Sequence, residues 1–241
     1  MIFLDQFQIY RTELEALSKM ISIRAFEFTD VRFTIDGNML TSECACGADT
    51  FAYKFKQKLA RAIPEPQTFT VAVSEFNNML SIFKGTLDIN IKVEDRLYIF
   101  TSSDGKLVMQ LREVEYTTLY PAAMNIPLDQ CVKFSLPVAD LKHLVSGFTI
   151  GTTEMVLRTR SGAVEAFFEN PSGTSLKLGA KIKEIDIPET TLRLDRSFVD
   201  VIGPLDTLDD VELYLSRTFP AVMKQKTSDF DLELVFVPYE L

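Results

Sequence analysis

Few side chains in this sequence could carry out covalent chemistry. Histidine occurs once, at His143, in an apolar-periodic segment with no nucleophile motif such as G-x-S-x-G beside it. The three cysteines, Cys44, Cys46 and Cys131, cannot form a complete disulfide set, and their spacing lacks the second ligand pair of a structural zinc site. The sequence also has no Gly-rich phosphate loop. We therefore expect buried or half-buried thiols, no metal, no cofactor and no enzymatic activity; a hydrolase that uses dispersed carboxylates is the alternative.

The composition is typical of a globular protein that works inside a cell. The chain has 241 residues, 46% hydrophobic and 24% charged, and a formal charge of −9 at pH 7. This length suits one large domain or two of about 120 residues, because single cores stop growing at roughly 250 residues, and we expect two. No apolar run approaches the roughly 20 residues that cross a bilayer, and no signal-peptide pattern begins the sequence. We expect an intracellular protein, in the cytoplasm or nucleus (the host cytoplasm if it is viral), without a membrane partner.

Four segments of the chain share one pattern of apolar residues. They begin at Phe7, Phe69, Phe134 and Leu192 and read FQIYRTELEALS, FTVAVSEFNNML, FSLPVADLKHLV and LRLDRSFVDVI. In each segment two apolar residues first alternate with polar ones, as on a strand with one buried face. The apolar spacing then changes to three and four residues, as on a helix. Each segment therefore predicts a strand that leads into a short amphipathic helix.

Local signals bound the four expected helices. Residues suited to helix starts stand near each N-terminus, with a capping-box pair in the first: Thr12 with Glu15, Ser74, Pro137 and Asp195. Glycines stand near the second, third and fourth C-termini, at Gly85, Gly147 and Gly203. The helices should span about two to three turns, so they need a sheet to pack against.

After each helix the pattern predicts about three antiparallel strands. This unit of one strand, one helix and three strands recurs roughly every 60 residues, and two units make one domain. The periodicity is absent from 115 to 130, where Tyr120-Pro121 and Ile126-Pro127 favour an extended connector. The sequence thus predicts an α+β protein with an N-terminal domain at 1–114, a connector at 115–130 and a C-terminal domain at 131–241.

The order of these motifs resembles the sliding clamps of DNA replication, of the proliferating cell nuclear antigen type that also includes archaeal and tailed-phage clamps. The most specific parts are FTVAVSEFNNMLSIFKG at 69–85, the triplet at 125–127, GTSLKLG at 173–179, and the run from DVELYLSRTFPAVMKQK through VFVPYEL. The likeness covers nearly the whole chain. It implies the DNA-clamp fold, with two similar domains, antiparallel sheets outside and short helices inside.

The resemblance implies a processivity factor that assembles as a ring of three copies joined head to tail. Such a ring encircles duplex DNA without sequence preference, tethers the replicative DNA polymerase, and is placed by an ATP-driven clamp loader. Pairing the edge strand of one subunit with the opposite edge of the next removes two exposed edges. By position, these edges are the strand with Leu107, Met109 and Leu111 and the strand with Leu176 and Leu178. The alternative is that both are ordinary core strands.

The charge of the chain bears on how it would hold DNA. A formal charge of −9 argues against binding by electrostatics, but a ring linked topologically needs only enough positive charge in its hole to avoid repulsion. The resemblance places the DNA-facing residues on the polar faces of the helices: Arg11, Lys19, Lys84, Lys142, His143 and Arg196. Lys84 matches the family best, and each residue could instead be a solvated surface charge. Four acidic residues accompany them, Glu13, Glu15, Asp140 and Asp200, so we expect only a mildly positive inner wall.

A second basic cluster alternates with aromatic residues. Lys54, Lys56 and Lys58 alternate with Tyr53 and Phe55, which predicts a strand with three lysines on one face. The lysines could form a basic strip that contacts DNA or a charged, protected sheet edge, and we favour the edge. A platform for single-stranded DNA is disfavoured, because the alternation sends the aromatic side chains to the other face.

Clamps of this family bind polymerases, loaders and repair enzymes through short peptides, between the connector and the C-terminal strand. By position, this peptide site comprises Ile126, Leu128, Pro220, Val235, Val237 and Pro238. An extended connector has spare backbone groups for a peptide strand, and an adjacent apolar pocket can take an anchoring side chain. The alternative is a packed linker beside a frayed terminus.

Two other functions remain open from the sequence. One is a clamp-like processivity factor that works as a monomer or dimer and holds DNA electrostatically, which a steep loss of affinity with salt would indicate. The other is a protein-interaction scaffold with this fold and no DNA function. A mass in solution near three times 27.3 kDa favours the ring.

Overall fold

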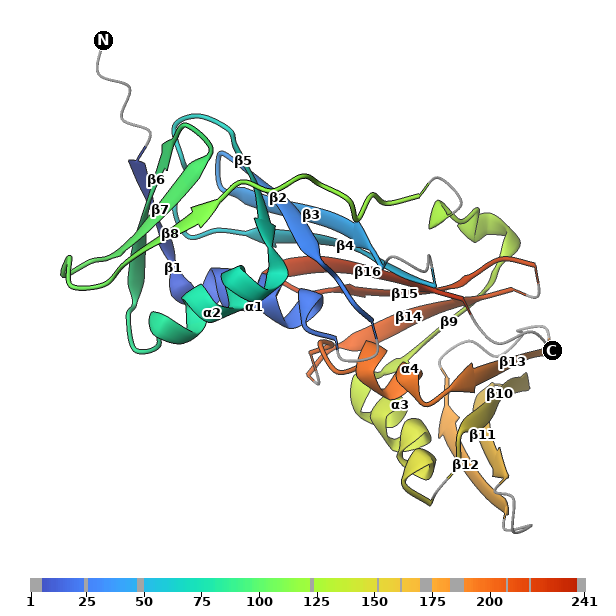
Figure 1. Cartoon of the computed structure of the whole chain (residues 1–241). Helices are drawn as coiled ribbons and strands as arrows, with labels where there is room; N and C mark the ends of the chain where they lie inside the picture. Colours follow the sequence, from blue (N-terminus) through green and yellow to red (C-terminus); the bar gives the residue numbers. More distant parts are fainter. Residues whose placement is uncertain are drawn as a thin grey trace. The chain divides into compact units, whose positions relative to one another are not determined.

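The computed structural model shows a chain that divides into two compact units (Figure 1). It describes residues 6–23, 26–46, 50–121, 124–150, 152–160, 162–169, 175–182, 189–206, 208–216 and 218–237. Unit 1 consists of Met1–Asp49 and Tyr53–Tyr120, and unit 2 consists of Thr50–Ala52 and Pro121–Leu241. The division at Tyr120 falls inside the segment that the sequence marks as a connector.

Each of the four repeated segments forms a strand that runs straight into an α-helix. In unit 1 these pairs are β1 (Gln6–Tyr10) with α1 (Arg11–Ile21), and β5 (Gln67–Ala72) with α2 (Val73–Ile82). In unit 2 they are β9 (Val132–Pro137) with α3 (Val138–Val145), and β13 (Thr190–Asp195) with α4 (Ser197–Val201). The change of apolar spacing from two residues to three and four therefore marks the strand–helix junctions correctly.

Three of the expected cap residues are not at the cap positions: Thr12, Ser74 and Asp195. Thr12 and Ser74 lie inside the first turns of α1 and α2, because each preceding strand runs on to the residue before the helix. At the start of α1, the Tyr10 N–H donates instead to Glu13 Oε2 at 2.9 Å. Asp195 lies one residue before the cap position of α4, which is Arg196, but its carboxylate accepts the N–H of Ser197, the first residue of α4, at 2.9 Å.

The helices are short and bury their apolar stripes. They have 11, 10, 8 and 5 residues, so the fourth is shorter than the two turns expected. Leu14 and Leu17 of α1, Phe76 of α2 and Leu144 of α3 are fully buried. A 3-10 helix (Ser146–Ile150) continues α3. Gly147 in this segment packs closely on the Phe168 ring: a Cβ there would lie 2.3 Å from the ring, so a larger residue would force the ring to move. No helix in the described parts of the chain is long and apolar enough to cross a membrane.

Three strands follow each helix, as the repeat predicts. In unit 1 they are β2 (Asp30–Asp36), β3 (Met39–Ala45) and β4 (Phe51–Lys58), then β6 (Asp88–Glu94), β7 (Leu97–Ser102) and β8 (Val108–Arg112). In unit 2 they are β10 (Glu154–Arg160), β11 (Ala163–Glu169) and β12 (Ser175–Lys181), then β14 (Asp210–Leu215), β15 (Ala221–Lys226) and β16 (Phe230–Phe236).

The first strand of each repeat pairs with the three strands of the other repeat in its unit. β1 pairs with β6 in the order β1-β6-β7-β8, and β5 pairs with β2 in the order β5-β2-β3-β4. Unit 2 repeats this exchange, with β13 beside β10 in the order β12-β11-β10-β13, and β9 beside β14 in the order β16-β15-β14-β9. Each helix therefore carries the chain from one sheet to the other, so two repeats are needed to complete either sheet.

In unit 1 the two helices and the start of the connector lie on opposite faces of one sheet (Figure 1). On the helix face, Phe33 of β2 stacks on Phe69 of β5 with ring centroids 4.8 Å apart and contacts Phe76 of α2 at 5.7 Å. Because side chains alternate along a strand, Arg32 and Thr34 point to the other face. The segment that follows β8 crosses that face on its way to Tyr120.

Candidate functional site

Three of the six basic residues expected to face DNA belong to the helix pair of unit 1. Lys19, in the last turn of α1, and Lys84, just after α2, are exposed. Arg11 is engaged within the unit, because it pairs with Glu15 at 2.7 Å and donates through Nε to the Leu80 carbonyl at 3.3 Å. Hydrogen bonds join the start of α1 to the end of α2 and the end of α1 to the middle of α2, so the helices run antiparallel. Lys19 and Lys84 therefore lie at opposite ends of the pair.

The other three residues belong to the helices of unit 2. His143 on α3 and Arg196, just before α4, are exposed. Lys142 is half-buried, and its Nζ lies 3.5 Å from the Leu205 carbonyl. In each unit, then, the exposed basic residues on the helices are few.

The acidic residues expected beside them do not all act on this surface. Glu13 is 8% exposed, and its carboxylate accepts the N–H groups of Tyr10 and Ala60 at 2.9 and 2.7 Å. Glu15 is occupied by its ion pair, while Asp140 and Asp200 in unit 2 are half-buried. Glu75, in the first turn of α2, is exposed and adds a carboxylate that is not among the four expected acidic residues. The exposed charge of the helices is therefore small.

The two strands expected at the subunit interface are both terminal strands of their sheets. β8 ends the order β1-β6-β7-β8, and β12 ends the order β12-β11-β10-β13. Leu107 precedes β8 and is half-buried, as are Met109, Leu176 and Leu178. Leu111 is 1% exposed, so its side chain belongs to the core of unit 1 and only its backbone is available at the edge.

The residues expected to bind partner peptides differ in their exposure. Ile126, Leu128 and Pro220 are half-buried, and Leu128 begins a 3-10 helix, Leu128–Gln130, within the connector. The antiparallel register of β15 and β16, continued by one residue, places Pro220 opposite Val237, which is 49% exposed. Val235 is fully buried, so its side chain cannot anchor a peptide, because it already packs in the core of unit 2. Pro238 lies outside the described residues.

Asp30 fastens the start of the connector to unit 1. The Thr117 N–H donates to Asp30 Oδ1 at 3.1 Å, and the Thr117 hydroxyl donates to Oδ2. Thr118 adds its hydroxyl at 2.9 Å and its N–H at 3.4 Å, and Thr29 adds a hydroxyl at 3.0 Å. Burial alone would raise the pKa of Asp30, but these hydrogen bonds outweigh it and hold the pKa below its ordinary value of 3.8. The carboxylate therefore stays ionised and holds two consecutive connector residues.

The three cysteines are shielded from solvent to different degrees. Cys44 and Cys46 are buried and Cys131 is half-buried, all as free thiols. Burial raises the pKa of the Cys44 thiol to about 12, and its Sγ lies 2.9 Å from Thr118 Oγ1. Among the described residues, no group of three or more His, Cys, Asp or Glu side chains could hold a metal ion.

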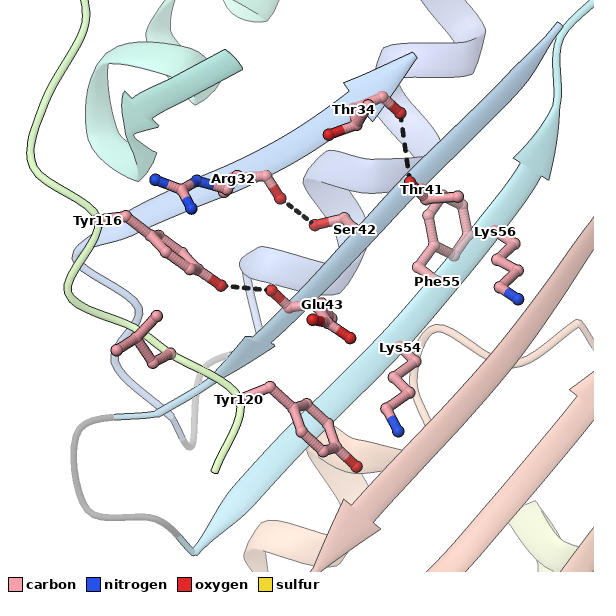
Figure 2. Close-up of a pocket in the computed structure, with 11 residues that line it drawn as sticks. Arg32, Thr34, Thr41, Ser42, Glu43, Lys54, Phe55, Lys56, Tyr116 and Tyr120 are labelled. Atoms are coloured by element: carbon pink, nitrogen blue, oxygen red, sulfur yellow. Dashed lines mark hydrogen bonds between the residues drawn. The ribbon is translucent and has the colours of Figure 1, made fainter. Parts of the chain in front are cut away.

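A pocket that the sequence reasoning missed lies on the connector side of the unit 1 sheet (Figure 2). It has a volume of about 460 Å³ and is lined by residues of β2, β3, β4 and the connector: Arg32, Thr34, Thr41, Ser42, Glu43, Lys54, Phe55, Lys56, Tyr116, Leu119 and Tyr120. The Arg32 guanidinium lies over the Tyr116 ring, and Lys54 Nζ lies over the Tyr120 ring, each 4.3 Å from the ring centroid. The sequence does place three lysines on one face of β4, but not the residues that complete the pocket.

The favoured interpretation of the lysine cluster as a charged, protected sheet edge is wrong, because β4 is not a terminal strand of its sheet. Lys54 and Lys56 line the pocket on the face of the sheet, whereas Lys58 is exposed on the same strand and does not line it. The aromatic residues that alternate with the lysines, Tyr53 and Phe55, are buried, as the alternation predicts. Only the connector, which is distant in sequence, turns this lysine face into a pocket.

Known structures match the chain in fold. No family model and no curated protein sequence matches it. PCNA from Thermococcus kodakaraensis is 10% identical, with a TM-score of 0.78 over 97% of this chain and 99% of that chain. A. fulgidus PCNA, in a structure with the C-terminal region of FEN-1 bound, is also 10% identical, with a TM-score of 0.75 over 98% of both chains. The DNA polymerase III beta chain from Streptococcus pneumoniae is 14% identical, with a TM-score of 0.81 over 100% of this chain and 66% of that chain.

These matches agree with the repeat and the strand exchange described above. The chain spans nearly the full length of the two PCNA chains but only about two thirds of the bacterial beta chains that it matches, 66% in three of them. Identities of 10–14% establish a fold rather than an activity. The fold implied by the sequence resemblance is thus confirmed: the chain has the α+β fold of the DNA sliding clamps.

Proposed function

We propose that the chain is a DNA sliding clamp, which encircles duplex DNA and tethers a replicative DNA polymerase without catalysing a reaction itself. The observation that carries the proposal is the full-length match of its two-unit fold to PCNA, over 97–98% of this chain and 98–99% of the PCNA chains. A fold alone does not specify a function, so the surfaces of the chain must also suit the role. Three surfaces of the chain have physical properties that suit a sliding clamp.

The first is the pair of terminal strands, β8 and β12. As a terminal strand, each presents backbone N–H and C=O groups that no neighbouring strand of its own sheet pairs. Such groups promote aggregation of a free chain, and they can join one copy to the next in a ring. Pairing β8 of one copy with β12 of the next is a head-to-tail contact, which closes when the rotation per copy divides the circle. We infer a ring of three copies, as the likeness to PCNA implies.

The second is the small exposed charge of the helices. The exposed basic residues there are Lys19, Lys84 and Arg196, beside the exposed carboxylate of Glu75, in a chain with a formal charge of −9. Such a surface binds phosphates weakly, which suits a ring that stays on DNA by topology and slides along it. Arg11 and Lys142, which have partners within the chain, would contribute less, and His143 is exposed and could add a hydrogen bond.

The third is the end of the β15–β16 ladder in unit 2, where Pro220 and Val237 leave apolar surface exposed. A. fulgidus PCNA has been solved with the C-terminal region of FEN-1 bound, so this fold can take a peptide from a partner. We propose that polymerase and clamp-loader peptides dock here together with Ile126 and Leu128. Val235 supports the strand from the core.

Retention on circular DNA tests the proposal. The chain would be loaded onto a nicked circular plasmid with a clamp loader and ATP, and bound chain would be separated from free chain by gel filtration at moderate salt. We expect the chain to stay with the circle and to be released when a restriction enzyme linearises it. Equal retention on the linear product would indicate electrostatic binding instead. No retention on the circle, from a chain whose mass is three times 27.3 kDa, would leave a scaffold without DNA function.

A further inference from the structure

The pocket on the connector side of unit 1 shares no lining residue with the three surfaces of the proposed function. It lies on the connector side of β2, β3 and β4, and its lining residues come from Arg32 to Tyr120 (Figure 2). It does not include the terminal strand β8, or Ile126, Leu128, Pro220 and Val237. Any ligand of this pocket would therefore bind without competing for the helices or the strand edge.

The pocket is positively charged in a negatively charged protein. Three cations line it, Arg32, Lys54 and Lys56, against one carboxylate among the described lining residues, that of Glu43. The whole chain has 34 acidic and 25 basic residues, so this local excess runs against the composition. A concave site lined mainly by one sign of charge concentrates ligands of the opposite sign.

Two of the cations are available to a ligand. In the described part of the chain, neither Arg32 nor Lys56 forms a salt bridge, and both are exposed. The Arg32 guanidinium has five N–H donors, of which Nε donates to Thr70 Oγ1 at 3.3 Å. Stacking on Tyr116 fixes the plane of the guanidinium while the terminal N–H groups have no acceptor among the described residues, which is the geometry for bidentate capture of a carboxylate (Figure 2).

The remaining lining is amphipathic. The connector contributes Leu119, which is 64% exposed, and two half-buried tyrosines, Tyr116 and Tyr120. A volume of about 460 Å³ is in the range of pockets that enclose a few side chains, and it is too small to admit a nucleic-acid duplex. Single-stranded nucleic acid would need free aromatic faces, whereas each tyrosine ring here already carries a cation on one face. Charge and shape together favour a protein segment with acidic and apolar side chains.

The connector wall is fixed before any ligand binds. Asp30 holds Thr117 and Thr118, the Tyr116 hydroxyl donates to the Glu43 carbonyl at 2.5 Å, and the Ala45 N–H donates to the Thr118 carbonyl at 3.2 Å. A preformed wall reduces the ordering cost of binding. This wall is what distinguishes the pocket from a row of lysines on an open sheet.

We propose that this pocket is a docking site for an acidic peptide segment of a partner protein, with a carboxylate on Arg32 and Lys56 and an apolar side chain against Leu119 and Tyr116. The proposal does not rest on ring formation or on DNA binding, because every residue that it uses belongs to unit 1. It can therefore fail or succeed separately from the proposed function.

Fluorescence anisotropy with a pool of short labelled peptides tests the proposal. The peptides share a fixed Glu-Glu-Leu core with varied flanks, and a second pool has Gln in place of both Glu residues. We expect the full chain to bind the Glu pool, and Arg32→Gln or Lys56→Gln to weaken that binding about tenfold, because each removes a charge-assisted contact. The Gln pool should bind the wild-type chain as weakly as the Glu pool binds these variants.

Lys58→Gln is the matched control, because Lys58 is exposed on the same strand but does not line the pocket. It should change the affinity less than twofold, and thermal melts should show that all three variants fold. Failure of the Glu pool to bind, or equal binding of both pools, would overturn the proposal. Tighter binding of a labelled single-stranded oligonucleotide that is lost in Arg32→Gln would also overturn it, and would assign the pocket to nucleic acid.

Discussion

Asp30 shows how one buried carboxylate can position a long segment. It lies at the start of β2, is 4% exposed, and accepts hydrogen bonds from Thr117 and Thr118, 87 and 88 residues away in the chain. A buried acceptor without partners is costly, and here every donor but Thr29 comes from the connector. The carboxylate and the connector therefore depend on each other.

Replacing Asp30 with Ala should lower the free energy of unfolding by about 2–3 kcal/mol at pH 7, because it removes a charged acceptor and leaves the Thr117 and Thr118 N–H groups unpaired. Urea denaturation measures this loss. Hydrogen exchange should show faster exchange of the same two amides. The matched control is Asp36→Ala, at an exposed position on the same strand, which should change stability by less than about 0.5 kcal/mol.

The same residue predicts a pH dependence. Its folded-state pKa lies below the ordinary value of 3.8, so the unfolded chain binds a proton more readily than the folded chain. The stability contributed by Asp30 is therefore fully present above about pH 5 and is lost as the pH falls through 3.8 toward the folded pKa. The difference between wild type and Asp30→Ala should shrink over this range. A difference that is absent at pH 7, or that is as large at pH 3, would contradict this account.

At the scale of elements, the terminal strands decide whether copies of the chain can join. β12 alternates half-buried and exposed residues along its seven positions, and the apolar Leu176 and Leu178 lie on its less exposed side. β8 is shorter, with Val108 60% exposed and Leu111 buried. An edge of this kind pairs readily with another strand unless charge blocks it.

Leu176→Arg should disrupt the oligomer, because it places a charge against the apolar side chains of the adjoining strand. Light scattering should give a mass near 27.3 kDa for this variant and three times that for the wild type. Leu208→Arg makes the same change at a residue that is 91% exposed and lies outside both edge strands, and it should leave the mass unchanged. If Leu176→Arg keeps the full mass while it remains folded by circular dichroism, β12 is not at the interface.

At the scale of the whole molecule, the question is how a chain with a formal charge of −9 could remain on DNA. The exposed cations on the helices are Lys19, Lys84 and Arg196, and Lys19 and Lys84 lie at opposite ends of α1 and α2. A helix of 11 residues is about 16 Å long, so the two lysines would contact different phosphates. Little counterion release is available to hold the protein by charge alone.

We therefore expect weak binding to a short linear duplex, with a slope of log affinity against log salt no steeper than about −3 per chain. Lys19→Gln with Lys84→Gln should weaken this binding equally for unrelated sequences and make the slope shallower, without changing the oligomer mass. Lys56→Gln, in the pocket on the connector side of unit 1, is the control and should leave duplex binding unchanged. A steep slope that the double variant does not alter would place the DNA contacts elsewhere.

The sequence by itself determined the elements and their repetition. The local signals are the strand and helix periods, the turn glycines, and the Tyr120-Pro121 and Ile126-Pro127 steps of the connector. They predict one strand, one helix and three strands, in that order, four times over. The edges at Met109 and Leu176 were also correctly predicted as terminal strands, because the family resemblance supplied their positions. Local signals were least reliable at the helix starts, where Thr12 and Ser74 were assigned as caps although the strands leave no loop for them.

Only the tertiary structure decided which elements meet. The exchange of first strands between repeats, as in β1 with β6 and β5 with β2, leaves no local mark, because a strand with one apolar face can pair with any partner of matching pattern. Packing in the folded chain buries Leu111 and Val235, which the family resemblance placed at the subunit interface and at the peptide site. Folding also brings Asp30 to Thr117 and places Arg32, Lys56 and Tyr116 in the lining of one pocket. Contacts between residues so far apart in the chain depend on strand pairing and packing, and these are properties of the folded chain as a whole.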